Sequence, residues 1–329
     1  MDVIISQILA TLTTAFLGIL ENVSQCREHG TGDYHQRCMR YIERTGRFLM
    51  HVESLLSTWK KELGMIHDLY SSVFDGLNRT VMRCILCPEP AGGELAAMNR
   101  CTKIERVQGV GDDEMIVINL SLSPACWELL PTRLRLAAMQ AGLAYVDLPV
   151  DAVMFTQGVN EQQTLANKSS QMSVDAKQAV QDKINVESLD KLREIHRIYR
   201  ACDATVADAA EGSAPLEWRG AIDWAGMEAM LAKAERAIDN SDGRAEKHAL
   251  VLQTTQQYCV RLGAARVTCC KSGKDRTGMV GPKDRHPFPC CISLLADRRP
   301  FPCCISLLAH RRPFPCFISL LAGIARVFS

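Results

Sequence analysis

One segment near the carboxyl end of the chain most limits what this sequence can fold into. Residues 264–268, Ala-Ala-Arg-Val-Thr, form a short apolar run that is typical of a buried strand. Shortly after it, residues Cys270–Met279 read Cys-Lys-Ser-Gly-Lys-Asp-Arg-Thr-Gly-Met. Gly273 and Gly278 permit tight turns and a close approach of the backbone to a ligand. We therefore predict a strand, an anion-binding loop and a helix, in that order, within an α/β domain rich in helix and built on a small sheet.

This loop carries a thiol and an arginine in a pattern suited to phosphate chemistry. Cys270 precedes Arg276 by six positions. A helix N-terminus and nearby cations lower the pKa of a thiol from about 8.5, so the nucleophilic thiolate accumulates. Successive backbone N–H groups form an anion nest, and a planar guanidinium can hold two phosphoryl oxygens. The pattern predicts transfer of a phosphoryl group to Cys270 and hydrolysis of the phosphocysteine by water.

The other loop residues are assigned to binding. Ser272 or Thr277 can donate a hydrogen bond to the sulfur, and two lysines suit a substrate with more than one phosphate. The predicted phosphate-binding residues are Lys271, Ser272, Gly273, Lys274, Thr277 and Gly278. No metal is required, because the thiolate and the arginine supply the chemistry.

A general acid must protonate the leaving oxygen. Asp275 lies inside the loop beside Arg276 and resembles the loop aspartate of myotubularin-type lipid phosphatases, so we assign it this role. Its alternative role is that of a structural anion bracing the loop lysines. Asp223, next to Trp224, is a second candidate, although a helix start explains it more simply. Glu161 could line the pocket without a defined role.

Three look-alike motifs carry less weight. Cys38 and Arg44 repeat the Cys-x5-Arg spacing without a glycine, in a stretch whose periodicity predicts a helix surface. A nucleotide-binding P-loop would need glycine at 268 and a hydroxyl at 275, where the chain has Thr268 and Asp275. Cys84-x2-Cys87 has metal-ligand spacing but lacks the second pair of a zinc site.

Three segments together resemble the inositol polyphosphate 4-phosphatases, which remove the 4-phosphate from phosphatidylinositol 3,4-bisphosphate. They are Cys270–Met279, Phe155–Leu165 (Phe-Thr-Gln-Gly-Val-Asn-Glu-Gln-Gln-Thr-Leu) and Ile184–Leu189 (Ile-Asn-Val-Glu-Ser-Leu). The loop is also similar to that of the phosphatase and tensin homologue, which carries lysines at the places of Lys271 and Lys274. The resemblance implies a cysteine-phosphatase-like fold, a phosphoinositide headgroup at a membrane surface as the partner, and no cofactor.

The resemblance covers residues 1–280, which we predict to form the catalytic region, helical over 1–75 and mixed over 76–280. It matches the C-terminal part of the longer family chain, without the family's N-terminal C2 domain. Residues 281–329 form a tail of three near-identical 13-residue units that start at Arg285, Arg298 and Arg311. Solenoid repeats are longer and more diverged, so we expect an aberrant tail of low structural order. The helix after Arg276 would end before Gly281-Pro282.

Charge and hydropathy exclude other classes. A net charge of +1 gives no indication of nucleic-acid binding. A local basic patch is expected from Arg261, Arg266, Lys271, Lys274 and Arg276. Residues 3–23 have apolar positions at helical spacing and no cationic leader before them, so they predict a core helix rather than a membrane span. We expect a cytoplasmic protein that meets membranes only peripherally.

Periodicity predicts further elements. Helices are expected at 3–23, 36–75, 132–143, 173–202, 221–238 and 244–262, with Gly263 as the C-cap of the last one. A strand pair is expected within 104–122 and another strand at Tyr145–Phe155. Two alternatives to a phosphoinositide phosphatase stay open. One is a truncated, inactive product that binds headgroups or a protein, and the other is a dual-specificity or protein tyrosine phosphatase.

Overall fold

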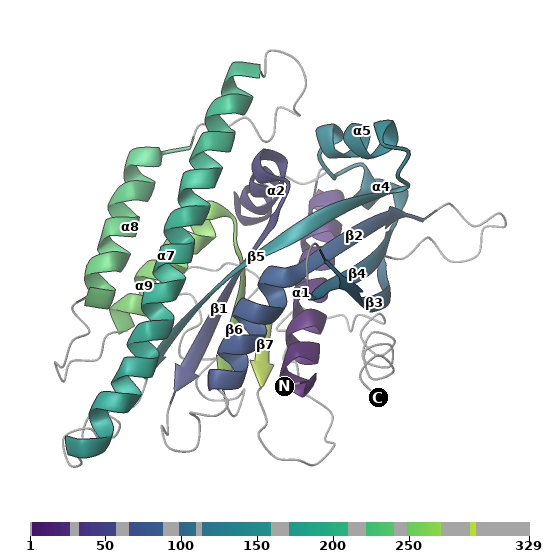
Figure 1. The fold of residues 1–329 in the computed structure, drawn as a ribbon. Helices are drawn as coiled ribbons and strands as arrows, with labels where there is room; N and C mark the ends of the chain where they lie inside the picture. The colour runs from purple at the N-terminus through teal and green to yellow at the C-terminus, as the bar shows by residue number, and fades with distance from the viewer. Residues whose placement is uncertain are drawn as a thin grey trace.

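A computed structural model shows an α/β protein in which one mixed sheet lies between two layers of helices (Figure 1). The structure describes residues 2–26, 33–56, 66–87, 99–109, 114–158, 171–209, 222–239, 249–270 and 290–293. The sheet has the strand order β3-β4-β2-β5-β1-β6-β7. The strands are β1 (Phe48–Leu56), β2 (Thr80–Leu86), β3 (Arg100–Gln108), β4 (Glu114–Leu122), β5 (Tyr145–Gly158), β6 (Ala265–Cys270) and β7 (Cys290–Ser293).

The helices are long relative to the strands. They are α1 (Asp2–Cys26), α2 (Asp33–Thr45), α4 (Pro124–Trp127), α5 (Thr132–Gln140), α7 (Gln171–Ala209), α8 (Trp224–Asp239) and α9 (Ala249–Leu262). Residues 66–71 form a further helical stretch, which continues into the π-helical turn η1 (Ser72–Gly76) and the 3-10 turn η2 (Leu77–Arg79).

The sheet has a parallel centre and a mixed wing. β1 lies between β5 and β6 and is parallel to both, and β7 is parallel to β6. On the side away from β1, β5 pairs with β2. This pairing is antiparallel and covers only the first part of β5, Tyr145–Pro149. β2 is parallel to β4, and β3 is antiparallel to β4. The four strands of the parallel centre, β5, β1, β6 and β7, therefore end together at one edge of the sheet, the lower edge in Figure 1.

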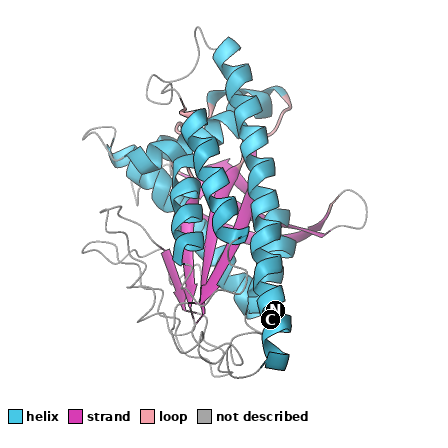
Figure 2. Cartoon of the chain, turned by 90° about the vertical axis from the view of Figure 1, so that its left-hand side faces the viewer, coloured by secondary structure: helices cyan, strands magenta, loops and turns pink. Residues whose placement is uncertain are grey.

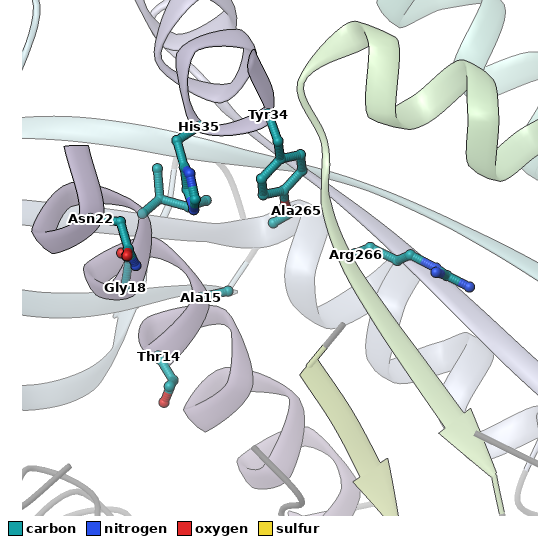
Figure 3. Close-up of a pocket in the computed structure, with 9 residues that line it drawn as sticks. Thr14, Ala15, Gly18, Asn22, Tyr34, His35, Ala265 and Arg266 are labelled. Carbon is teal, nitrogen blue, oxygen red and sulfur yellow. The ribbon is translucent and has the colours of Figure 1, made fainter. Parts of the chain in front are cut away.

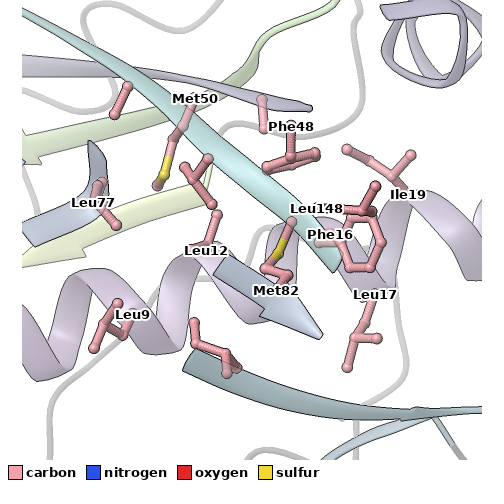
Figure 4. Packing of buried hydrophobic residues seen from close by; sticks show 14 of the residues in the cluster. Leu9, Leu12, Phe16, Leu17, Ile19, Phe48, Met50, Leu77, Met82 and Leu148 are labelled. Carbon is pink, nitrogen blue, oxygen red and sulfur yellow. The ribbon is translucent and has the colours of Figure 1, made fainter. Parts of the chain in front are cut away.

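Helix α1 covers one face of the sheet. Its residues Leu9, Leu12 and Phe16 are fully buried and pack against Phe48, Met50 and other strand residues (Figure 4). The ring centroids of Phe16 and Phe48 lie 5.3 Å apart in an edge-to-face contact. α1 is long and apolar enough to cross a membrane by composition, but 67% of that window is buried inside the protein. Its burial agrees with the predicted core helix.

Helices α7, α8 and α9 cover the other face of the parallel centre and stand side by side over the strands (Figure 2). Leu49 of β1 and Val153 and Phe155 of β5 pack there against Leu192 of α7 and Tyr258 of α9. The parallel centre is therefore buried on both faces, as is usual for parallel strands.

The predicted long helix over 36–75 is wrong. α2 ends at Thr45, and Gly46 follows with a φ of 68°, a left-handed conformation that closes the helix. The chain then forms β1, the strand at the centre of the parallel group. Phe48–Leu56 is covered on both faces, so its apolar residues lack the alternation that identifies a half-exposed strand.

Most other elements are confirmed with shifted ends. α1, α5, α7, α8 and α9 correspond to predicted helices, β3 with β4 is the predicted strand pair, and β5 and β6 are predicted strands. Gly263 has a φ of 93° after α9. β2 was not predicted. β7, from the first tail repeat, departs from the expected low order at these four residues, and the other repeats lie outside the described residues.

Candidate active site at the carboxyl edge of the parallel strands

The predicted nucleophile lies at the end of a central parallel strand. Cys270 is the last residue of β6 and is in register with Leu55 of β1. Its partners in the loop, Lys271 to Gly278 including Asp275 and Arg276, lie outside the described residues, as does Glu161. The backbone therefore delivers Cys270 to the edge at which β1 and β5 also end.

This edge is a topological switch point. The chain leaving β1 leads to the helical stretch 66–71, whose residues Ile66 and Leu69 pack with α1. The chain leaving β5 leads to α7, whose residue Leu192 packs on the opposite face. Because the two connections lead to opposite faces of the sheet, the carboxyl ends of β1 and β5 lie where open α/β sheets bind ligands. Cys270 ends the strand next to β1 and is thus adjacent to this point.

A buried ion pair ties the nucleophile's strand to the central strand. Arg266 of β6 donates from Nε to Oε1 of Glu53 at 2.9 Å and from Nη2 to Oε2 at 2.7 Å. Thr268 donates from Oγ1 to Oε2 of Glu53 at 3.1 Å. Glu53 is fully buried and Arg266 is 6% exposed. This pairing satisfies the carboxylate and fixes the lateral position of β6 two residues before Cys270.

His51 lies beside this pair as a neutral group. Its Nδ1 is 3.7 Å from Oε1 of Glu53, and its ring meets Phe155 edge to face. Burial lowers the pKa of His51 to about 4; the Glu53 charge opposes this shift and Arg266 adds to it. Neither ring nitrogen has a hydrogen-bond partner in the part of the chain that the structure describes.

Side chains take the place of a missing strand along the second half of β5. Asn78 bridges the N–H and C=O of Ala152 at 2.8 and 3.2 Å. Ser188 accepts from the Met154 N–H at 3.3 Å and donates to its carbonyl. One residue pair further on, Asn185 bridges the N–H and C=O of Thr156 at 2.9 and 3.1 Å, and Gln181 donates to the same carbonyl at 3.0 Å.

These contacts bring two of the family-like segments together. Thr156 belongs to Phe155–Leu165, and Asn185 and Ser188 belong to Ile184–Leu189. The sequence analysis assigned no role to Asn185 or Ser188. The signal was available, because two small polar residues three positions apart interrupt the apolar face of a helix and are 2% and 0% exposed in the fold. Their partners could not be foreseen, since both are backbone groups.

Several sequence-based assignments need correction. Cys38 and Arg44 do lie on a helix, but they are buried, 1% and 9% exposed, and are not a helix surface. Burial raises the pKa of Cys38 to about 12, so this thiol is a poor nucleophile. Arg266 does not belong to a basic patch, because Glu53 neutralises it.

Asp223 starts a helix, as its simpler interpretation predicted. Its Oδ1 accepts from the Gly226 N–H at 2.9 Å at the beginning of α8. The Trp224 indole donates from Nε1 to Asp203 at 3.0 Å. Both residues are thus engaged in the helical layer.

The paired cysteines 84 and 87 do not form a thiolate cluster with Cys101 in the described fold. Burial raises the pKa of Cys84, and burial also raises that of Cys101 to about 11. Cys84 is fully buried among apolar residues of the α1 face. Among the residues that the structure describes, no group of three or more histidine, cysteine or carboxylate side chains lies close enough to hold a metal ion.

A small cavity lies at the opposite end of β6 from Cys270. It is lined by Thr14, Gly18 and Asn22 of α1, Tyr34 and His35 of α2, and the start of β6 (Figure 3). The Arg266 side chain extends away from it, across the strand. The space open to water-sized spheres is about 40 Å³, which admits a few waters but no sugar phosphate.

Comparison with known proteins identifies the family. A model described as the INPP4A C-terminal domain matches residues 1–282. The chain belongs to this family. The type II inositol 3,4-bisphosphate 4-phosphatase of Pongo abelii is 26% identical over 278 residues, which are 84% of this chain and 25% of that protein. The inositol polyphosphate 4-phosphatase type II of Homo sapiens shows the same identity and coverage.

The type II enzyme of Rattus norvegicus is 24% identical over 280 residues, 84% of this chain and 24% of that protein. The chain thus spans about a quarter of the length of these relatives. The match ends at residue 282, close to the position at which the resemblance was predicted to stop.

Proposed function

We propose that this chain is a cysteine-dependent phosphoinositide phosphatase that removes the 4-phosphate of phosphatidylinositol 3,4-bisphosphate. The observation that carries the proposal is the position of Cys270, at the carboxyl end of a central parallel strand and next to a switch point, in a chain of the INPP4A C-terminal domain family. The names of its relatives supply the substrate and the phosphate removed. The sequence predicts the strand, loop and helix order of cysteine phosphatases around Cys270, and we propose that the site works at a membrane surface from the cytoplasmic side.

The proposed reaction has two steps. The Cys270 thiolate attacks the phosphorus, a sulfur–phosphorus bond forms, and the bond to the inositol oxygen breaks. Asp275 gives that oxygen its proton, and Arg276 binds the phosphoryl oxygens as charge builds up on them. Water then attacks the phosphocysteine, releases inorganic phosphate and restores the thiolate.

Binding of the remaining phosphate is assigned to Lys271 and Lys274. Ser272 and Thr277 donate hydrogen bonds to the sulfur or to phosphoryl oxygens. Gly273 and Gly278 have no Cβ, so they allow backbone N–H groups to approach the anion closely. The buried pair Glu53–Arg266 holds β6 against β1 and so fixes the strand that leads to this loop. The fully engaged Arg266 leaves phosphate binding to the loop cations.

Phosphate release from short-chain phosphatidylinositol 3,4-bisphosphate tests the proposal. Native chain is compared with Cys270→Ser and with Cys38→Ala, which removes the thiol of the second Cys-x5-Arg pattern. We expect release that Cys270→Ser abolishes and Cys38→Ala retains. The 3- and 4-monophosphates and a phosphotyrosine peptide, run in parallel, identify the phosphate removed. No release from a folded chain that still binds headgroups would favour an inactive binding product, and preference for the peptide would favour a protein phosphatase.

A further inference from the structure

The second half of β5 needs partners that no neighbouring strand supplies. After Pro149, β1 is the only strand paired with β5 in the described part of the chain. Backbone groups of alternate residues point to the same side of a strand, so the polar groups of Ala152, Met154 and Thr156 face the edge away from β1. Buried backbone groups without partners are costly, so this edge must be closed by other atoms.

The closing atoms come from two places. Asn78, which follows the turn η1, closes the edge at Ala152. Ser188 and Asn185, on the buried side of α7, close it at Met154 and Thr156. A side-chain amide offers one acceptor and a donor, as a peptide group does, so each asparagine replaces one residue of a strand.

We propose that Asn185 is a positioning residue for headgroup binding, because it fixes the end of β5 at the switch point beside Cys270. The inference rests on the proposed function. Thr156 lies two residues before the end of β5, at Gly158, and three of its bonds come from α7. Asn185 is 2% exposed, so water cannot take over its bonds without opening the interface.

Loss of the Asn185 amide frees the last residues of β5 from α7 and lets them shift against β1, the strand that separates β5 from β6. A shift on the order of 1 Å in a site can cost about 100-fold in rate. We therefore expect Asn185→Ala to weaken headgroup binding by about 10- to 100-fold. Ser188 acts two residues earlier and supports the same stretch.

Asn78 provides a matched control. It makes the same two-bond bridge to β5, but at Ala152, four residues or about 13 Å before Thr156 at 3.3 Å per residue. Asn78→Ala therefore removes a two-bond bridge of the same kind from the same edge of β5, but far from the carboxyl end of the strand. A merely structural role would make the two variants alike.

The experiment uses the full chain in a Cys270→Ser background, which stops turnover. Inositol 1,3,4-trisphosphate, the soluble headgroup of the proposed lipid, is titrated calorimetrically into the parent, Asn185→Ala and Asn78→Ala, and the thermal midpoint of each is measured. Support requires weakening of at least 10-fold in Asn185→Ala, within twofold in Asn78→Ala, at similar losses of thermal midpoint. Equal changes in the two variants, or no change in either, would overturn the inference.

Hydrogen exchange separates this inference from the proposed function. Asn185→Ala is expected to speed exchange in residues 156–158, and Asn78→Ala in residues 150–153, without any ligand. If the Cys270→Ser parent does not bind the headgroup and the native chain does not hydrolyse it, the proposed function fails. In that case, localised exchange at 156–158 would support the fixing of β5, and unchanged exchange there would overturn it.

Discussion

An ion pair between an arginine and a carboxylate joins neighbouring strands in two regions of the sheet, and the surroundings of the two pairs differ. In the parallel centre, Arg266 and Glu53 join β6 to β1 with side chains 6% and 0% exposed. In the wing, Arg83 and Asp147 join β2 to β5 through two bonds of 2.9 and 2.8 Å, with side chains 30% and 36% exposed. Both pairs are bidentate, and the largest difference between them is burial. We therefore expect the helices that cover each pair to decide how much unfolding free energy is lost when that pair is broken.

The wing is more exposed than the centre along β2 and β3, whereas the middle of β4 is buried. The burial of β2 alternates along the strand from Thr80 to Ile85, and β3 is largely exposed. Arg83 stacks over the Tyr145 ring at 4.0 Å and remains in contact with water. In the centre, polar groups must satisfy one another.

The largest expected effect comes from breaking the buried pair. Glu53→Gln removes the carboxylate charge that the buried Arg266 guanidinium pairs with, which costs about 3–5 kcal/mol of unfolding free energy. The matched wing variant, Asp147→Asn, should cost at most about 1 kcal/mol, because solvent screens the exposed pair. Urea denaturation of both variants measures the difference. Equal losses would refute the contrast between the two regions.

Glycines give a second pair of sites. Gly263 has a φ of 93°, and a Cβ there would lie 2.3 Å from the carbonyl oxygen of Arg37. Gly142, before β5, has a φ of 69° with open space around it. Gly263→Ala should therefore cost on the order of 3 kcal/mol, from overpacking plus left-handed strain. Gly142→Ala should cost only the strain, about 1–2 kcal/mol. Thermal midpoints would contradict this if Gly142→Ala were the more damaging.

The buried histidine of the centre predicts a pH dependence. The pKa of His51 is about 4 in the fold, below its value of about 6.5 in an unfolded chain. The unfolded state therefore binds more protons between these values, and the stability is full above pH 6.5 and falls as the pH drops toward 4.

Between pH 8 and pH 5 we expect His51 to account for a loss of about 2 kcal/mol. His51→Gln stays neutral and should remove that part of the slope. Burial also lowers the pKa of His35 and His196, so both contribute to the same slope in either chain. Denaturation curves of the two chains at several pH values isolate the His51 contribution. Parallel slopes would show that His51 does not titrate as proposed.

The smallest change in unfolding free energy is expected at an exposed residue of helix α5. Met139 of α5 is 70% exposed, so Met139→Gln should change the unfolding free energy by less than about 0.5 kcal/mol. Met50 of β1 is fully buried, and Met50→Ala should cost about 2–5 kcal/mol. A large loss at Met139 would mean that this surface is covered in solution.

The sequence by itself determined the elements whose residues carry a local pattern. The strands 100–108 and 114–122 and the amphipathic helices carry their patterns in consecutive residues. The sequence also predicts Cys270 and its loop as a phosphate site, because a thiol, glycines and cations lie within ten positions. The family resemblance from three short segments agreed with the match over residues 1–282.

Only the tertiary structure decided what depends on distant residues. β1 has no readable period because both of its faces are buried, and its identity as the central strand follows from its pairing with β5 and β6. Arg266 looked like a surface cation until its partner, 213 residues away, was in place. Asn185 binds a backbone group, which leaves no trace in side-chain composition. Local spacing encodes elements and loops, whereas burial and non-local pairing exist only after the chain has folded.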